Sequence, residues 1–270
     1  MTAPVFVFTP ETIEPADAVA SAAFGTVLML TGPEARHAVT VKRLRAQERV
    51  DLVDGAGRRL VCEVTGAGVG GAKDRLAVRV LERVEEPEPS LRLTLVQALA
   101  KGGRDEQAVE TATEVGVGLV LPWQSERCVS VWQGAKQTKG RQRWQATALQ
   151  AAKQARRARV PEVEEVRDTR RLADWVGQTA RGGGVVLVLH EEARTPISTA
   201  MESVRLPGPG EAPLALAVVV GPEGGISPEE TAALEVAGAT TVRLGPHVMR
   251  PASAGPVALA VLAHASGLWE

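Results

Sequence analysis

Three glycines and one acid follow an uninterrupted apolar run in LALAVVVGPEGGI, which covers residues 214–226. The apolar run lacks the alternation of a half-exposed strand, so it predicts a strand buried on both faces of a parallel sheet. Gly221, Gly224 and Gly225 carry no side chains, which lets their backbone amides lie close to a ligand. Glu223 adds one carboxylate to the same turn. The turn alone does not separate a ligand-binding loop from a plain strand-to-helix connection.

A second loop of the same kind lies in TVRLGPHVMR, residues 241–250, where a short apolar strand precedes a turn at Gly245 and Pro246. In open α/β sheets, ligands bind outside the carboxyl ends of the strands. Two such loops from neighbouring strands could therefore enclose one ligand. Neither loop matches the glycine-lysine motif of P-loop proteins or the Gly-x-Gly-x-x-Gly motif of dinucleotide-binding folds. A P-loop kinase and an ordinary Rossmann dehydrogenase are thus disfavoured.

The elements that must position these loops form two patterns. From residue 5 to about 85, short apolar runs alternate with glycine-rich turns, which is typical of a small, mostly β domain. The charged, proline-containing stretch EEPEPS at 85–90 marks a boundary, so we expect domains at 1–86 and 91–270. In the second domain strands alternate with helices, which predicts a parallel α/β fold. The expected strands are 91–99, 118–123, 185–190, 214–220 and 241–244, and the expected helices are 105–115, 137–158, 228–237 and 253–268.

The composition is that of a protein that stays in the cytoplasm. No apolar run approaches the roughly 20 residues that span a bilayer, and the first residues lack a basic segment followed by a hydrophobic signal core. Cys62 and Cys128 are the two cysteines, and they lack metal-ligand spacing. We expect them to be small buried side chains, and we expect no metal site.

Positive charge is concentrated although the net charge is only −1. The segment 127–161 contains no Asp or Glu but nine Lys and Arg residues, and a second basic cluster lies at 36–45. Such single-sign segments are typical of surfaces that bind a phosphate backbone. A solvated helix face, or one that pairs with acids elsewhere, is the alternative. Because the chain has no Tyr and three Phe, we expect recognition of RNA backbone and shape rather than stacking of many bases.

Five segments in order along the chain resemble the bacterial 16S ribosomal RNA uridine-N3 methyltransferases of the SPOUT superfamily. Nearly the whole chain is covered, and 164–184 and 191–213 carry no signal. The segments are RHAVTVKRLRAQERVDLVDGAGRRLVCEV at 36–64, KGGRDEQAVETATEVGVGLVLPWQSERCV at 101–129, QARRARVPEV at 154–163, GPEGGIS at 221–227 and LGPHVMR at 244–250.

The resemblance implies a PUA-like β-barrel followed by a SPOUT α/β domain with a deep trefoil knot, acting as a homodimer on 16S ribosomal RNA of the small subunit. It also implies S-adenosylmethionine as cofactor, whose positive sulfonium fits loops without lysine. The implied cofactor residues are Leu189, His190, Val220, Gly221, Glu223, Gly225, Ile226, Leu244, Gly245, Val248, Met249 and Ser253. The implied RNA-binding residues are Arg36, His37, Lys42, Arg43, Arg45, Arg104, Arg127, Arg156, Arg157 and Arg159.

Methyl transfer is a displacement at carbon, so alignment of nucleophile, methyl group and sulfur contributes most of what an enzyme can add. Uridine N3 must lose a proton, which creates negative charge on the ring. The guanidinium of Arg250 can stabilise that charge but cannot act as the base. Glu223, His247 and solvent are candidate proton acceptors, and the sequence does not choose among them.

One departure from the family pattern follows Arg250, where the family usually has Thr, an acidic or polar residue, and Thr. This chain has Pro251, Ala252 and Ser253. Proline removes an amide donor and fixes its own φ, so we expect weaker positioning of cofactor or RNA. Two alternatives therefore stay open. One is a SPOUT methyltransferase acting on another RNA, and the other is a non-catalytic RNA-binding or ribosome-assembly protein.

Overall fold

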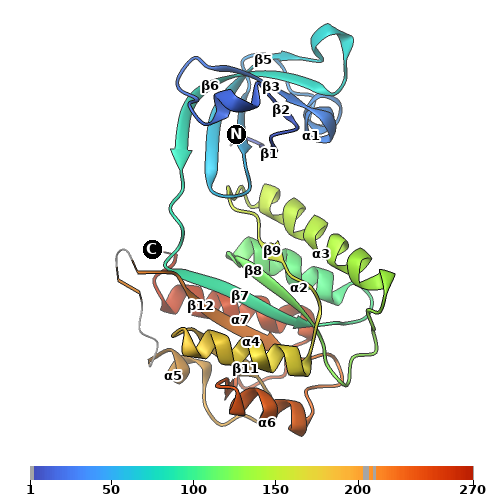
Figure 1. The fold of residues 1–270 in the computed structure, drawn as a ribbon, viewed down its shortest axis with the longest axis vertical. Coiled ribbons are helices and arrows are strands. Elements are labelled where there is room, and N and C mark those ends of the chain that lie inside the picture. Colours follow the sequence, from blue (N-terminus) through green and yellow to red (C-terminus); the bar gives the residue numbers. More distant parts are fainter. Residues whose placement is uncertain (1–2, 203–206, 209–210, 270) are drawn as a thin grey trace. The chain divides into compact units, whose positions relative to one another are not determined.

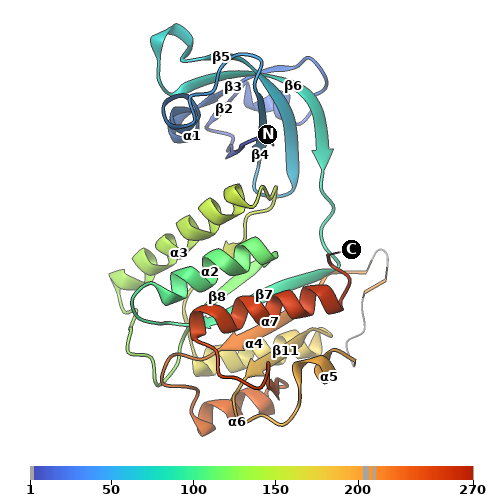
Figure 2. The ribbon, with the colours of Figure 1, turned by 180° about the vertical axis from the view of Figure 1, so that it is seen from behind.

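The computed structural model describes residues 3–202, 207–208 and 211–269. The chain forms two compact units (Figures 1 and 2). The first comprises Met1–Glu88 together with Ala152–Val160, and the second comprises Pro89–Ala151 and Pro161–Glu270. The short segment Ala152–Val160, which the sequence pattern left inside the second domain, thus belongs to the first unit.

The first unit is a curled six-stranded sheet. The strands are β1 (Val5–Val7), β2 (Ile13–Glu14), β3 (Val27–Thr31), β4 (Arg49–Val53), β5 (Arg58–Ala67) and β6 (Arg75–Glu85), in the order β1-β4-β5-β6-β3-β2. All pairings are antiparallel except β1 with β4. Register shifts at Val61/Cys62 and Val64/Gly66 bend the long strand β5, as bulges do. Alternate residues such as Leu28, Leu30 and Leu60 point into its apolar core.

Helix α1 (Gly32–Arg36) continues into a π-helical turn over His37–Val41 and lies against this sheet. The turn carries part of the first basic cluster. π-Helical turns are rare and occur frequently at functional sites. A sequence analysis based on apolar runs did not resolve these short helical elements.

The second unit is an all-parallel sheet covered by helices on both faces, as the alternating pattern predicted. The strand order is β10-β8-β7-β12-β11-β13, and β9 pairs with β8. The strands are β7 (Leu91–Ala98), β8 (Leu119–Gln124), β9 (Glu162–Val163), β10 (Arg167–Asp168), β11 (Val185–Leu189), β12 (Leu214–Val220) and β13 (Thr240–Val242). The helices are α2 (Arg104–Val115), α3 (Ala135–Gln154), α4 (Thr169–Arg181), α5 (Ile197–Glu202), α6 (Pro228–Val236) and α7 (Pro251–Ala265).

Two apolar layers hold this sheet. On one face the core includes residues of α2, α3 and α7, such as Val109, Trp144 and Leu259. On the other face α4 and α6 supply Leu172, Val176 and Leu234. Strand β12 lies in the middle of the sheet between β7 and β11, which explains its uninterrupted apolar sequence. Over the described residues no helix is both long and apolar enough to cross a membrane.

Helix α3 ends earlier than the apolar pattern suggested. The sequence predicted helix to residue 158, whereas α3 ends at Gln154. The N–H of Arg157 donates to Ala152 O at 2.9 Å and the N–H of Arg156 donates to Lys153 O at 3.1 Å. Arg156 itself adopts the left-handed conformation, with φ 57°. These bonds form a Schellman-type end, which satisfies carbonyls of the last turn and ends the helix.

Candidate cofactor and RNA sites

The two glycine-rich loops leave the sheet at the same edge. Strand β11 pairs in parallel with both β12 and β13, with Val188 opposite Val219 and Leu189 opposite Val242. Parallel strands place their carboxyl ends at one edge, so the loops after all three strands emerge together. The N–H of His190 donates to Val242 O at 3.0 Å, which fixes the first residue after β11 beside β13.

The loop Gly221–Ser227 is a closed turn that leads into helix α6. The N–H of Gly225 donates to Pro222 O at 2.9 Å, and Gly225 has φ 74°, a conformation that favours glycine. A Cβ at Gly221 would lie 2.6 Å from Ile226 Cγ1, so the close return of the loop requires glycine there. Ser227 and Glu230 then form a capping box at the start of α6.

The second loop leads from β13 to helix α7. Leu244 and Gly245 are half-buried, whereas Val248, Met249 and Arg250 are exposed. Arg250 is extended, with ψ 149°, and Pro251 is the first residue of α7. Proline is favoured at this position because its missing N–H would lack a helical partner in any case. The backbone therefore accommodates Pro251 as the first residue of α7, and Ser253 N–H donates to Arg250 O at 2.9 Å. The expected effect of Pro251 on the positioning of cofactor or RNA stays a prediction.

Glu223 forms an ion pair inside the site. Its Oε1 accepts from Arg104 Nη1 at 2.8 Å and from Lys101 N–H at 3.4 Å. Partial burial alone would raise the pKa of the Glu223 carboxyl, but its backbone, Arg104 and Lys101 hydrogen bonds together lower it. The carboxylate is therefore charged at neutral pH, and a carboxylate with a lowered pKa is a weak general base there.

Arg127 also contacts the glycine-rich loop. Its Nη1 donates to Gly224 O at 3.2 Å. Arg104 and Arg127 were both predicted to bind RNA, which stays a prediction, and the structure brings both side chains to the Gly221–Ser227 loop. The sequence placed both arginines in the second domain but could not show that they contact this loop.

The donor set at this edge fits S-adenosylmethionine. The loops offer backbone amides and carbonyls and, besides Glu223, mostly uncharged side chains. Among the described residues, Gln97 Oε1 and Thr241 Oγ1 are buried without a hydrogen-bond partner, and both residues belong to strands of this sheet. A Cβ at Gly245 would meet no heavy atom within 4 Å. Free acceptors and open space of this kind suit a cofactor with amino and hydroxyl groups.

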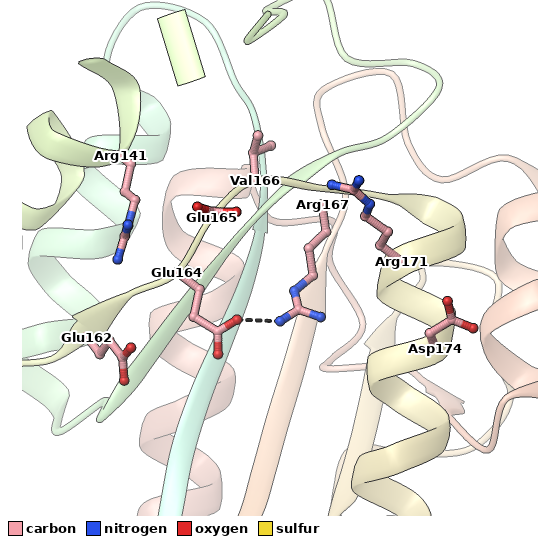
Figure 3. A pocket seen from close by; sticks show the side chains of 8 residues that line it. All are labelled: Arg141, Glu162, Glu164, Glu165, Val166, Arg167, Arg171 and Asp174. Carbon is pink, nitrogen blue, oxygen red and sulfur yellow. Dashed lines mark hydrogen bonds and ion pairs between the residues drawn. The ribbon is translucent and has the colours of Figure 1, made fainter. Parts of the chain in front are cut away.

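Two cavities are lined by residues outside these two loops. One, of about 500 Å³, is lined by acids and arginines at the β9 and β10 edge, where Glu164 pairs with Arg167 (Figure 3). The other, of about 510 Å³, lies at the carboxyl ends of β8 and β10 and includes Cys128 and Glu230. Neither contains a predicted cofactor residue. No group of His, Cys, Asp and Glu in the described chain could hold a metal ion.

The first basic cluster is accessible in the first unit. The exposed members are Arg36, Lys42, Arg43 and Arg45. His37 is half-buried, with its ring 5.8 Å from that of Phe6 in an edge-on arrangement. Burial lowers the pKa of His37, and the nearby Lys153 and Lys42 charges lower it further against the opposing effect of Glu34. His37 is therefore neutral at pH 7 and adds no positive charge to the cluster.

The three arginines of the QARRARV motif lie in different environments. Arg159 donates from Nη1 to Ala56 O at 2.6 Å and from Nη2 to Glu86 O at 2.8 Å, and it lies directly against Gly57. Burial lowers the pKa of Arg157 to about 10, so it stays protonated at neutral pH. Arg156 is exposed. Arg159 thus has a structural role within the first unit, because it holds the segment 152–160 there. RNA binding by Arg156, Arg157 and Arg159 stays a prediction, and Arg156 is the most exposed of the three.

Sequence reasoning missed two buried polar residues near these sites, Lys153 and Gln97. Lys153 is buried and its Nζ lies 2.7 Å from Glu34 Oε1, and 5.7 Å from the centre of the Phe6 ring. Gln97 is a fully buried polar residue within an apolar strand. The signal for Gln97 was present, because polar residues interrupt LRLTLVQAL. No local signal distinguishes Lys153 from the exposed lysines of the same helix.

Comparison with known proteins covers both units. A family model described as RNA methyltransferase domain matches residues 86–263, and one described as RNA methyltransferase PUA domain matches residues 30–72. Proteins named ribosomal RNA small subunit methyltransferase E are similar over most of the chain. That of Mycobacterium bovis is 44% identical over 91% of this chain and 89% of its own, and that of Bacillus subtilis is 27% identical over 88% and 90%.

Solved structures agree in fold. The ribosomal RNA small subunit methyltransferase E of Neisseria gonorrhoeae, bound to S-adenosyl methionine, has a TM-score of 0.78 at 25% identity and covers 97% of this chain and 98% of its own. A putative methyltransferase of Legionella pneumophila has a TM-score of 0.75 at 24% identity, with 98% of both chains covered. The shared fold therefore extends over both units.

Proposed function

Because this chain belongs to the ribosomal RNA small subunit methyltransferase E family, we propose that it transfers a methyl group from S-adenosylmethionine to N3 of a uridine in 16S ribosomal RNA. The observation that carries the proposal is the meeting of the β11, β12 and β13 loops at one sheet edge, inside the matched methyltransferase domain. The PUA match in the first unit supports RNA as the substrate.

The residues that would hold the cofactor lie on those three loops and at the start of α7. When bound, the cofactor supplies an electrophilic methyl carbon on a positively charged sulfur. The protein's task is to orient this group and to exclude water. The proposed holding residues are Leu189, His190, Val220, Gly221, Glu223, Gly225, Ile226, Leu244, Gly245, Val248, Met249 and Ser253.

Arg250 is the proposed stabiliser of the deprotonated uracil. It lies where the second loop enters α7, and its side chain is exposed at the site rather than packed in the core. A fixed guanidinium favours the negative charge that develops when N3 loses its proton. Since the pKa of Glu223 is lowered and the carboxylate is paired with Arg104, His247 and solvent are the better candidates for the proton acceptor.

Three further properties belong to the same proposal. Val257 and Val261, one helical turn apart, are exposed on α7, and Val248 and Met249 are exposed on the loop before it. An apolar surface of this kind supports a homodimer, which light scattering of the purified protein would test. We also propose the deep trefoil knot that the family resemblance implies, and a cytoplasmic location, where ribosomal subunits are assembled.

The test of the function uses small ribosomal subunits that lack the modification. The protein is incubated with these subunits and labelled S-adenosylmethionine, and the labelled nucleotide is mapped by nuclease digestion and mass spectrometry. We expect N3-methyluridine at one position. Label on another base or another RNA would indicate the alternative SPOUT methyltransferase, and binding of cofactor and RNA without transfer would indicate an assembly protein.

Arg156 offers a way to separate folding from RNA binding. Its φ of 57° is one that glycine adopts without strain and that costs other residues about 1 kcal/mol. Arg156→Gly should therefore leave the protein as stable or slightly more stable, while it weakens binding to 16S RNA and reduces the salt dependence by about one phosphate contact. Thermal unfolding and salt-dependent RNA titrations measure the two effects.

The matched control for that prediction is Arg156→Lys, which keeps the charge and the unfavourable backbone conformation. We expect its RNA affinity to stay within about twofold of the wild type, because phosphate contacts depend mainly on charge. Unchanged affinity and salt dependence in Arg156→Gly would show that this residue does not contact RNA.

A further inference from the structure

Two arginines from neighbouring loops hold the Gly221–Ser227 loop. Arg104, the first residue of α2, bonds to the Glu223 carboxylate, and Arg127, just after β8, bonds to the Gly224 carbonyl. We propose that Arg104 and Arg127 are positioning residues for the methyl donor, and we call their two contacts with the loop the clamp. Within the clamp, the Glu223 carboxylate accepts the hydrogen bond of Arg104 and does not take up the proton of the substrate. The inference rests on the proposed function, because it assigns roles at the same cofactor site.

The sheet order makes this arrangement possible. Strands β8, β7 and β12 are consecutive neighbours and run parallel, with Val96 opposite both Leu121 and Val219. Their carboxyl ends therefore lie side by side at one edge. A loop after β7 or β8 can reach the loop after β12 with one side chain, although the residues are about a hundred positions apart in the sequence.

The loop between β7 and Arg104 is fixed by two carboxylates, which accept hydrogen bonds from two successive backbone amides. Asp105 Oδ2 accepts from Ala100 N–H at 3.3 Å, and Glu223 Oε1 accepts from Lys101 N–H at 3.4 Å. Asp105 is buried, and Gly102 and Gly103 between these contacts have positive φ, which allows the tight turn into α2. Arg104 thus leaves a fixed base when it reaches Glu223.

The loop that carries Arg127 is fixed by Glu230. This buried carboxylate accepts from Glu126 N–H at 2.8 Å and from the Thr169 hydroxyl at 2.6 Å, while its other oxygen accepts from Ser227 N–H at 3.3 Å. One side chain therefore ties the loop after β8 to the end of the glycine-rich loop.

Arg127 also limits the shape of that loop by contact. A Cβ at Gly224 would lie 3.2 Å from Arg127 Cβ and 3.4 Å from Arg127 O, so the loop backbone lies directly on this residue. Arg104 holds Glu223, and Arg127 holds Gly224. The two central residues of the turn are therefore each fixed by one arginine. The backbone amides of this turn are the groups that the proposed function assigns to the cofactor.

The exposure of the clamp indicates a local role rather than a contribution to global stability. The side chains of Arg104 and Glu223 are 46% and 30% exposed, and ion pairs with this much solvent contact add little to folding. Their effect should therefore appear in the order of the loop and in cofactor binding. Loss of the pair should not unfold the second unit.

The experiment measures S-adenosylmethionine affinity by calorimetry and methyl transfer by steady-state kinetics, using the full chain. The variants are Arg104→Gln, Glu223→Gln, the double variant, and Arg127→Met. We expect each single variant to raise the Kd for the cofactor about fivefold. The double variant Arg104→Gln/Glu223→Gln should have a Kd no higher than that of the weaker-binding of its two single variants, because both residues act through one interaction. The kcat and the shape of its pH profile should change little.

Arg92→Gln is the matched control. Arg92 pairs with Glu162 at 3.2 Å on the surface, and it lies at the opposite end of strand β7. This variant removes an exposed ion pair of the same kind from the same unit, so it should bind the cofactor like the wild type. Thermal unfolding of all variants should agree with the wild type to within about 2 °C.

Three results would overturn the inference. If Glu223→Gln abolishes kcat at unchanged Kd and removes the acid limb of the pH profile, Glu223 is the proton acceptor. A raised KM for the RNA substrate at unchanged cofactor Kd in Arg104→Gln or Arg127→Met would make these arginines RNA contacts. Unchanged Kd in all variants would show that the clamp does not position the loop. Absence of cofactor binding in the wild type would contradict the proposed function instead.

Discussion

Replacing Gly255 with valine is expected to lower the free energy of unfolding of the second unit by about 2–3 kcal/mol and to remove most cofactor binding. Gly255 is buried in α7, and a Cβ there would lie 2.6 Å from Leu95 Cδ1 and 3.1 Å from Val220 Cγ2. Leu95 is fully buried, so the close-packed core leaves little room for its side chain to move away.

The effect on binding follows from the position of Val220. This residue ends β12 and directly precedes Gly221, so displacement of α7 or β12 at this point moves the glycine-rich loop. Chemical denaturation and calorimetric titration with S-adenosylmethionine measure the two effects. Ala260→Val is the control, because it adds valine at a half-buried position of the same helix. Native stability and affinity in Gly255→Val would show that α7 can shift without cost.

Replacing Lys153 with methionine is expected to destabilise the first unit by about 2–3 kcal/mol, because it leaves the Glu34 carboxylate partly buried without its cation. The two side chains are only 7% and 21% exposed, and their charged atoms are 2.7 Å apart. Glu34 also accepts from Val7 N–H at 3.2 Å, which keeps the expected loss at or below the lower end of the range of about 3–5 kcal/mol for a broken buried pair. Hydrogen exchange of β1 and β4 measures the loss.

Two further variants serve as controls for the loss of stability in Lys153→Met. The double variant Glu34→Gln/Lys153→Met should recover much of the lost stability, since no unpaired charge remains. Arg75→Met, which breaks the exposed Arg75–Glu14 pair of the same unit, should cost less than about 1 kcal/mol. Loss of the Lys153 charge should also raise the pKa of His37 toward its usual value, which NMR titration detects. Unchanged exchange in Lys153→Met would show that the pair does not hold segment 152–160.

The first unit therefore depends on a segment that lies far away in the sequence. Besides Lys153 and Arg159, Ala158 is buried with Val5 and Val53, and the N–H of Val160 donates to Gly55 O at 2.9 Å. The QARRARV motif is thus mainly a structural part of the PUA unit, with Arg156 as its exposed cation. RNA binding by this arginine-rich motif stays a prediction, and Ala158, Arg159 and Val160 already pack or hydrogen-bond within the first unit.

The sequence by itself determined the layers of the fold and the location of the candidate site. Uninterrupted apolar strands such as 214–220 can only be covered on both faces, and glycine at 221 and 225 marks a turn that other residues would strain. These are local properties, since strand periodicity and φ preferences act over a few residues. The segment 164–184 was left without assigned elements, and it contains β10 and all of α4. Strand β10 has only two residues and gains its stability from pairing with β8. Helix α4 was missed although its sequence carries an Asp168 N-cap and apolar residues at helical spacing.

Only the tertiary structure decided what each charged side chain does. Arg104 and Arg127 contact residues 119 and 97 positions away, and Arg59 donates to the carbonyl of Arg156, 97 positions away. An arginine has the same flexible side chain and charge whether it faces RNA, a carboxylate or a backbone carbonyl. Its partner is set by which loops the sheet order and the end of α3 bring together. That choice is non-local, so residue type and spacing could locate the basic segments but could not assign their members.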